Sequence, residues 1–168
     1  YVGAMLVDPD WVGEWQDPWA TNATRDARPL VVVSLSSTFQ NQRDALQRII
    51  AALGTLDVRG LVTLGPVMAR ERFDMPANVR TVDAAPHSAI FPHASAVDTH
   101  AGHGTVMRAL AHGVPVLCLP MGRDQDDMAA RVVAHGVGLR LRRSAGPRQI
   151  ARAVQRLLEE PAYRTAAQ

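Results

Sequence analysis

The stretch Leu30-Val31-Val32-Val33-Ser34-Leu35 decides the fold class, because a β-branched, apolar run of this length is typical of a buried strand. Polar residues 36–38 follow the run, and a helix is predicted from about Asn41. Gly54 is placed to end this helix. The apolar residues of the helix recur on one face, and they are Ala45, Leu46, Ile49, Ile50 and Leu53.

The same alternation of strand and helix continues along the chain. Further strands are predicted at residues 60–64, 79–82, 96–99, 116–119 and 138–141. Further helices are predicted at residues 104–112, at residues 124–135 and from Pro147 onward. This order predicts an α/β fold, in which a Rossmann-like parallel sheet carries helices on both faces. Ligands of such sheets bind beyond the carboxyl ends of the strands, which directs attention to loops 36–40, 100–105 and 120–125.

Residues 1–28 differ from the remainder in composition, and we interpret them as a lead-in or linker before a domain of residues 29–168. Three tryptophans recur at every fourth position, but Pro18 interrupts the helix that this spacing would allow. We expect the aromatic rings to pack against the edge of the domain rather than to contact a ligand. The tryptophans are Trp11, Trp15 and Trp19.

The composition excludes several classes of protein. Eighteen basic and sixteen acidic residues nearly balance, so we expect no nucleic-acid partner. Every basic residue among the eighteen is an arginine, which excludes a Schiff-base or P-loop lysine in this chain. No apolar run approaches the length of a membrane span, and no basic and apolar leader pattern occurs, so we expect no secretion signal. The single Cys118 lies in an apolar run, so we expect a buried, inert thiol and a cytoplasmic protein.

Segment 99–105 has the features of an anion site, since a strand ends there, two glycines follow and a helix begins. Free amide groups and the positive end of the helix dipole attract negative charge at a helix start. Gly102 and Gly104 would let a phosphate approach the backbone closely. Thr105 adds a hydroxyl, and His100 adds a ring N–H. A tight turn with Thr105 as the helix cap fits the same residues, so both interpretations stay open at this point.

A dinucleotide site is not favoured. Its fingerprint places Gly-x-Gly-x-x-Gly after the first strand of the sheet, with an acidic residue about 20 positions later. No glycine occurs at residues 36–38 after the first strand, and Met107 stands where a third glycine should follow Gly102 and Gly104. We therefore expect neither a nicotinamide nor a flavin cofactor.

A longer pattern surrounds segment 99–105. It reads Ala85-Pro86-His87, Phe91-Pro92-His93-Ala94, Thr99-His100-Ala101-Gly102-His103-Gly104-Thr105, Gly113-Val114-Pro115, Pro120 and Asp124-Gln125. In order and spacing it resembles the donor-binding signature of the UDP-glycosyltransferase superfamily, which includes the bacterial enzymes that decorate antibiotics. Tyr1-Val2-Gly3 also resembles the interdomain lead-in of that family. The resemblance implies that the chain is the carboxy-terminal, nucleotide-sugar-binding half of a two-domain GT-B glycosyltransferase.

The resemblance assigns a part of the donor to each group of residues. The diphosphate would lie against Ser37, His100, Gly102, His103, Gly104 and Thr105. The nucleobase and ribose would lie against Ala84, Ala85, His87 and Arg108, the last of which replaces a glutamate of plant relatives. The hydroxyls of the sugar would lie against Asp124 and Gln125, because a carboxylate accepts from hydroxyls and an amide both accepts and donates.

The resemblance also implies the reaction. An acceptor oxygen displaces the nucleoside diphosphate with inversion at the anomeric carbon, and a cationic or N–H-donating His100 helps to stabilise the leaving group. We expect no metal, because Asp124 and Asp126 lie at a helix start, where acidic residues are favoured anyway. The spacing of a zinc site is also missing from His87, His93, His100 and His103.

The expected partners follow from the same resemblance. The donor would be a UDP- or dTDP-sugar, with the bacterial pattern favouring a dTDP-deoxysugar, and no cofactor is expected. The small-molecule acceptor and the catalytic base would belong to an amino-terminal domain, so we assign no catalytic residue here. Two alternatives stay open: a nucleotide-sugar epimerase of the same architecture, and a non-catalytic or degenerate nucleotide-sugar-binding module. Arg108 and Met128 keep the second one open, because they depart from the pattern of the family.

Overall fold

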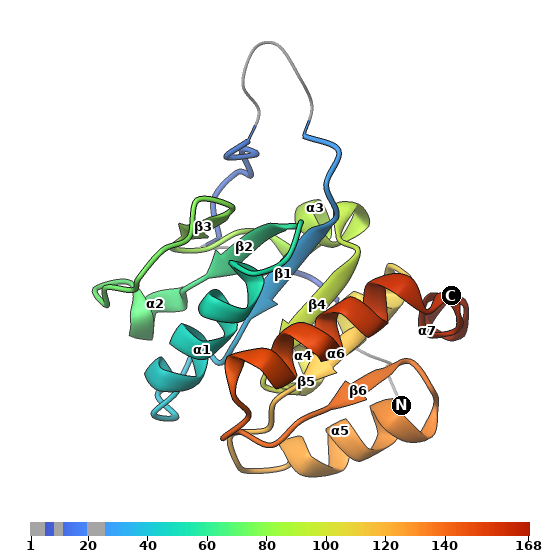
Figure 1. Ribbon diagram of the computed structural model, residues 1–168. Coiled ribbons are helices and arrows are strands. Elements are labelled where there is room, and N and C mark those ends of the chain that lie inside the picture. The colour runs from blue at the N-terminus through green and yellow to red at the C-terminus, as the bar shows by residue number, and fades with distance from the viewer. Residues whose placement is uncertain (1–5, 9–11, 20–25) are drawn as a thin grey trace.

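The computed structural model describes residues 6–8, 12–19 and 26–168 (Figure 1). Its centre is a six-stranded parallel sheet with the strand order β3-β2-β1-β4-β5-β6. The strands are β1 (Leu30–Ser34), β2 (Arg59–Thr63), β3 (Val79–Val82), β4 (Ala96–Thr99), β5 (Val116–Cys118) and β6 (Gly138–Arg140). The sequence predicted all six, and every predicted strand end agrees with the structure to within one residue.

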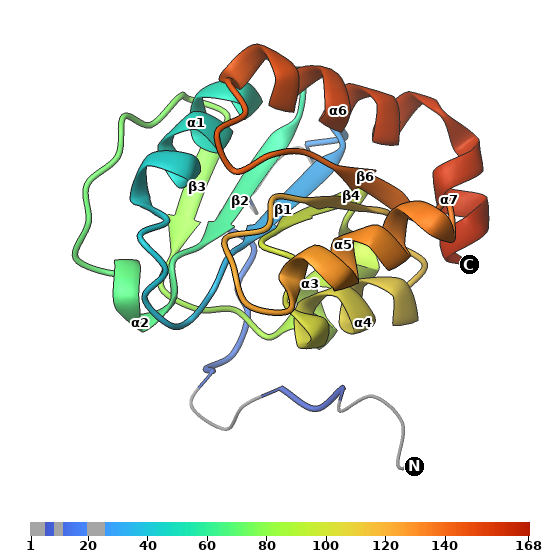
Figure 2. The ribbon, with the colours of Figure 1, turned by 90° about the horizontal axis from the view of Figure 1, so that it is seen from below.

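Helices cover both faces of the sheet, as predicted (Figure 2). One face carries α1 (Arg43–Leu53), α2 (Gly65–Met68) and α6 (Pro147–Glu159). The other face carries α3 (His87–Ile90), the 3₁₀ turn η1 (Phe91–His93), α4 (His103–Ala111) and α5 (Gln125–Ala134). The chain ends in α7 (Pro161–Ala167). The sequence missed α2, α3, η1 and α7, because elements of three to seven residues are too short to show a helical period.

Strand β1 lies at the centre of the sheet and is buried along its whole length. Val31 and Val33 belong to the apolar core beneath α1 and α6. Val32 belongs to a second core, beneath α3, α4 and α5. Covering on both faces explains why the strand reads as one continuous apolar run.

The chain leaves the two central strands toward opposite faces of the sheet. From β1 it continues into α1, and from β4 it continues into α4 on the other face. A parallel sheet opens a crevice between the carboxyl ends of such a pair of strands. The topology therefore places loops 36–40 and 100–105 on the two sides of one crevice.

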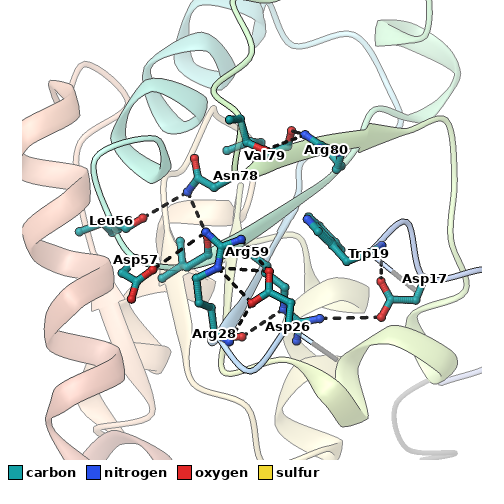
Figure 3. Close-up of polar contacts among 12 residues, drawn as sticks. Asp17, Trp19, Asp26, Arg28, Leu56, Asp57, Arg59, Asn78, Val79 and Arg80 are labelled. Atoms are coloured by element: carbon teal, nitrogen blue, oxygen red, sulfur yellow. Dashed lines mark hydrogen bonds and ion pairs between the residues drawn. The ribbon is translucent and has the colours of Figure 1, made fainter. Parts of the chain in front are cut away.

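The later part of the lead-in is anchored through Trp19, Asp26 and Arg28 at the amino-terminal edge of the sheet, opposite this crevice (Figure 3). Arg59, the first residue of β2, donates from Nε to the carbonyl of Arg28 at 3.1 Å. Its guanidinium lies 5.7 Å from the ring centre of Trp19. Arg28 in turn pairs with Asp26 at 2.6 Å. These contacts fix the chain where it enters β1.

Two tryptophans of the lead-in pack against the domain. Trp15 and Trp19 are half-buried and contact the core beneath α3, α4 and α5, which confirms the packing role expected of them. Trp11 and the segment 1–3 lie outside the described residues.

Cys118 is fully buried in β5, and burial raises the pKa of its thiol to about 12. The thiol is therefore protonated at neutral pH, as expected of an inert cysteine. Among the described residues, no helix combines the length and the apolar character that crossing a bilayer requires.

Candidate functional site

The loops that follow β1, β4 and β5 surround a cleft of about 370 Å³ at the carboxyl edge of the sheet. These are the three loops to which the strand ends directed attention. All twelve residues that the sequence assigned to a site line this one cleft: Ser37, Ala84, Ala85, His87, His100, Gly102, His103, Gly104, Thr105, Arg108, Asp124 and Gln125. The lining also includes Gln40 and Arg123 from two of these loops, and Asp8 and Val12 of the lead-in, which the sequence did not anticipate.

The start of α4 presents backbone N–H groups to the cleft. Gly102 is the residue before the helix, and the first amide bonded within the helix is that of Val106, which donates to the Gly102 carbonyl at 3.0 Å. Within the described part of the chain, no acceptor bonds the amides of His103, Gly104 or Thr105. These three donors and the positive end of the helix dipole point to an anion.

The side chain of Thr105 does not cap α4. It lies in the first turn of the helix, lines the cleft, and makes no capping hydrogen bond. The alternative in which Thr105 serves only as the cap of the helix is therefore wrong. Its hydroxyl is placed to act together with the neighbouring amides.

His100 lies almost wholly buried at the end of β4. Burial lowers the pKa of its ring and outweighs a hydrogen bond to the Ser34 backbone that raises it, while the charges of Arg123 and Asp124 act in opposite directions. The ring is therefore neutral at pH 7, which favours the N–H-donating form over the cationic form. Its Nδ1 lies 3.4 Å from the hydroxyl of Thr99, which orients the ring in the cleft.

Gly102 leaves room for the His100 ring. A methyl group at this position would lie 2.7 Å from Cε1 of His100 and still closer to Nε2. The backbone angles of Gly102, φ −65° and ψ 134°, are open to any residue, so glycine is needed here for space. The sequence had suggested that Gly102 leaves space for a phosphate. In the structure, the space beside Gly102 is filled by the ring of His100.

The loop after β1 is held by Ser36, which the sequence analysis did not single out. Its hydroxyl oxygen accepts from the amide of Thr38 at 3.1 Å and from Nε2 of Gln40 at 2.9 Å. Its carbonyl accepts from Gln42 at 2.6 Å. Ser37 is thereby left exposed on the cleft side of the loop, where the sequence placed it.

Gln125 joins two of the three loops. Its side-chain oxygen accepts from the amides of Met121 at 2.7 Å and Gly122 at 3.2 Å. Its side-chain nitrogen donates to Oε1 of Gln40 at 2.9 Å. A carboxamide nitrogen carries two protons, so one N–H of Gln125 is left to donate into the cleft. Gln40 lies 85 residues away in the chain, and local sequence could not reveal this contact.

Asp124 and Asp126 lie in different surroundings. Asp124 precedes α5, lines the cleft and is exposed. Asp126 pairs with Arg140 on β6 and does not line the cleft. Among the described residues, no cluster of three or more histidine, cysteine or carboxylate side chains is arranged to hold a metal ion.

The far end of the cleft is formed by Ala85 and by His87, the first residue of α3. His87 stacks on Phe91 at 4.3 Å between ring centres, and its Nε2 lies 3.1 Å from the hydroxyl of Ser34. Burial lowers the pKa of His87 to about 4, with Arg108 adding to the shift, so the ring is neutral. The backbone N–H and carbonyl of Ala85 are not hydrogen-bonded within the described ranges, which leaves them open toward a planar ligand edge.

Arg108 reaches across this end of the cleft to the lead-in. Its Nη2 donates to the carbonyl of Val7 at 2.7 Å, and its Nε donates to that of Leu6 at 3.4 Å. Asp8 follows directly and accepts from the amides of His87 at 2.9 Å and Ser88 at 3.0 Å. The position that the resemblance gave to ribose is thus occupied by a residue that binds the protein's own backbone.

Known proteins are similar to this chain in sequence and in fold. Residues 47–168 match the family described as erythromycin biosynthesis protein CIII-like, C-terminal domain. The 4′-demethylrebeccamycin synthase of Lentzea aerocolonigenes is 36% identical over 157 residues, which cover 93% of this chain and 35% of that protein.

Two solved structures have the same fold as this chain. The glycotransferase of kitacinnamycin superposes with a TM-score of 0.77 at 27% identity, covering 99% of this chain and 42% of that one. The glycosyltransferase VinC, in complex with dTDP, superposes with a TM-score of 0.75 at 29% identity, covering 92% of this chain and 39% of that one. The chain therefore spans less than half the length of the relatives that it matches.

Proposed function

Because this chain belongs to the erythromycin biosynthesis protein CIII-like C-terminal domain family, we propose that it is the donor-binding part of a natural-product glycosyltransferase. The observation that carries the proposal is the start of α4, where three backbone amides have no acceptor among the described residues and face the cleft. A nucleoside diphosphate supplies the negative charge that such a helix start attracts. The likeness to VinC, whose structure contains dTDP, supports a nucleotide-sugar donor.

The proposed donor lies along the cleft in three parts. The diphosphate binds at the start of α4 and at His100, the nucleoside extends toward Ala85, and the sugar lies beside Asp124. Asp124 accepts from sugar hydroxyls, and the remaining N–H of Gln125 donates to one. A dTDP-sugar or a UDP-sugar meets these requirements.

The proposed reaction is a displacement with inversion. The acceptor oxygen forms a bond to the anomeric carbon, and the electron pair of the broken bond leaves with the diphosphate. Negative charge then grows on the diphosphate, where the amides of α4, the Thr105 hydroxyl and the neutral His100 N–H stabilise it. Under this proposal the helix start does the work that a divalent metal does in other transferases, and no cofactor is used.

The small-molecule acceptor and the base that deprotonates it are proposed to belong to an amino-terminal domain. This division fits the relatives, of which the chain covers less than half. The buried, unpaired thiol of Cys118 suits a reducing compartment such as the cytoplasm.

Calorimetry on the 168-residue chain tests donor binding. UDP, dTDP and their sugars are titrated into the wild type and into His100→Ala and Thr105→Val, the second of which removes only the hydroxyl. We expect His100→Ala to weaken diphosphate binding by about tenfold or more, since a hydrogen bond to a charged group contributes about 1.5–3 kcal/mol. His100→Gln, which keeps an N–H donor, should recover part of the loss.

Two outcomes would contradict the proposal. A folded wild-type chain that binds none of these nucleotides would favour a degenerate module instead. Efficient glycosyl transfer by the chain alone would show that the base and the acceptor site lie within these residues, against the proposed division. We expect weak binding of a nucleotide sugar and no turnover.

A further inference from the structure

Three residues of the lead-in form a strap across the nucleoside end of the cleft. The strap is Leu6, Val7 and Asp8. Arg108 on α4 holds the carbonyls of Leu6 and Val7, and the amides of His87 and Ser88 hold the carboxylate of Asp8. Figure 2 shows the lead-in on the side of the sheet that carries α3 and α4. Contacts with residues at least 79 positions away thus define where this short segment lies.

The carboxylate of Asp8 lines the cleft and has hydrogen-bonding capacity left. An ionised carboxylate offers about four acceptor positions; the amides of His87 and Ser88 use two of them and the Ser88 hydroxyl a third, which leaves about one. Burial alone would raise the pKa of Asp8, but the hydrogen bonds from Ser88 and His87 outweigh it and lower the pKa below its usual value. Asp8 is therefore charged at neutral pH and can accept only, from N–H or O–H donors.

The geometry of α4 indicates which part of a nucleotide meets this carboxylate. The diphosphate site is the first turn of α4, and Arg108 lies one turn further along the same helix. Ala85, with its open backbone groups, lines the cleft two residues before His87, whose amide binds Asp8, so it lies near Asp8 and Arg108. Between a diphosphate and a nucleobase lies the ribose, whose hydroxyls are the donors that a fixed carboxylate accepts.

We propose that Asp8 binds the ribose hydroxyls of the nucleotide, and that Arg108 is a positioning residue that holds the strap in place for it. This inference rests on the proposed function, since it assumes a nucleoside diphosphate in the cleft. It gives the lead-in a direct part in donor recognition. It also gives Arg108 an indirect one, because two of its donors are spent on backbone carbonyls.

The test compares nucleotides with different numbers of sugar hydroxyls, and its decisive pair, dTDP and the dideoxy analogue, differs in one hydroxyl alone. UDP carries two, dTDP carries one, and 2′,3′-dideoxythymidine diphosphate carries none. We expect Asp8→Ala to weaken binding of dTDP by about tenfold or more, as for the loss of a hydrogen bond to a charged acceptor. The same substitution should leave the dideoxy nucleotide within about twofold of wild type. An equal loss for both nucleotides would overturn the proposal, because the strap would then shape the cleft without contacting the ribose hydroxyl.

Arg108 is tested by its coupling to Asp8. Arg108→Ala should weaken binding of dTDP in the wild type, but should add little in the Asp8→Ala background, because both changes remove the same contact. Additive losses would mean that Arg108 binds the ligand directly, against a positioning role. Arg80→Ala is the matched control, since Arg80 also donates to two backbone carbonyls but does not line the cleft.

The wild-type titration separates this inference from the proposed function. If the folded wild type binds dTDP and its dideoxy analogue equally, the ribose contact is refuted while donor binding stands. If it binds neither, the proposed function and the inference fail together.

Discussion

The two edges of the sheet use their hydrogen-bonding groups in opposite ways. At the amino-terminal edge, Asn78 donates to three backbone carbonyls and Arg59 donates to a fourth (Figure 3). At the carboxyl edge, the amides of His103, Gly104 and Thr105 face the cleft with no acceptor among the described residues. One edge is thus built for the stability of the fold, and the other keeps donors for a ligand. Substitutions at the two edges should therefore separate stability from binding.

The largest effect on binding is expected from Gly102→Ala. The new methyl group would lie 2.7 Å from Cε1 of His100, so the ring must leave its place in the cleft. Loss of the His100 donor and disturbance of the helix start should together weaken dTDP binding by about 100-fold, or about 2.7 kcal/mol. Titration calorimetry measures the affinity, and circular dichroism checks that the variant is folded.

Gly146→Ala is the matched control for this experiment. Gly146 also precedes a helix with extended backbone angles, φ −79° and ψ 164°, and a methyl group there would meet nothing within 4 Å. Its affinity for dTDP should equal that of the wild type. If the two alanine variants bind equally well, the space beneath His100 does not matter for the site.

At the opposite edge, Asn78→Ala should lower stability and leave binding unchanged. Nδ2 of Asn78 donates to the carbonyls of Leu53, Leu56 and Val58 at 2.9, 3.2 and 3.0 Å. The carbonyls of Leu53 and Leu56 keep backbone donors, so the substitution removes three hydrogen bonds but, among the described residues, leaves only the Val58 carbonyl without a donor, which should together cost about 2 kcal/mol. Urea denaturation measures the free energy of unfolding, and calorimetry with dTDP measures binding.

Asn78→Asp separates hydrogen bonding from shape at the same position. It keeps the size of the side chain but replaces the donor nitrogen with an oxygen that repels the three carbonyls. It should destabilise the chain at least as much as alanine does. A stable aspartate variant would show that shape alone matters here, and a loss of dTDP affinity in either variant would show that the two edges are not independent.

The sequence predicted the sheet and the location of the cleft for a physical reason. Strands buried on both faces read as continuous apolar runs, as in β1, and parallel strands expose their carboxyl-end loops at one edge. Gly54 stands directly after α1, the helix that it was expected to end. All of these signals are local in the chain.

The missed features are contacts between distant residues. The contact of Gln40 with Gln125 spans 85 positions, and that of Asp8 with His87 spans 79. No periodicity or motif in one sequence records which polar side chains meet across such distances. The contact of Arg108 with the strap is of the same kind, and the assignment of Arg108 to the nucleobase and ribose stays a prediction.

The smallest effect is expected from Asp98→Val, in the strand that leads to the cleft. Asp98 is fully buried on β4 between Val33 and Leu117, and its carboxyl oxygens have no hydrogen-bond partner among the described residues. Burial raises its pKa well above the usual value, so the folded chain keeps a proton that the unfolded chain releases. Valine removes this cost and should raise the free energy of unfolding by about 1 kcal/mol or more at pH 7.

The pH dependence of stability identifies the cause of this gain. In the wild type, stability should fall as the pH rises from the ordinary carboxyl pKa of about 4 toward the raised pKa of Asp98, because the folded state binds the extra proton. Asp98→Val should lack this decline, and Asp98→Asn should lack it too while gaining less stability, since its amide is still unpaired. Urea denaturation between pH 4 and pH 8 measures all three. If the free energy of unfolding depends on pH in the same way in the wild type and in both variants, the Asp98 carboxyl has a hydrogen-bond partner in solution. At the carboxyl-terminal edge of the sheet, polar groups without hydrogen-bond partners would then occur only in the cleft.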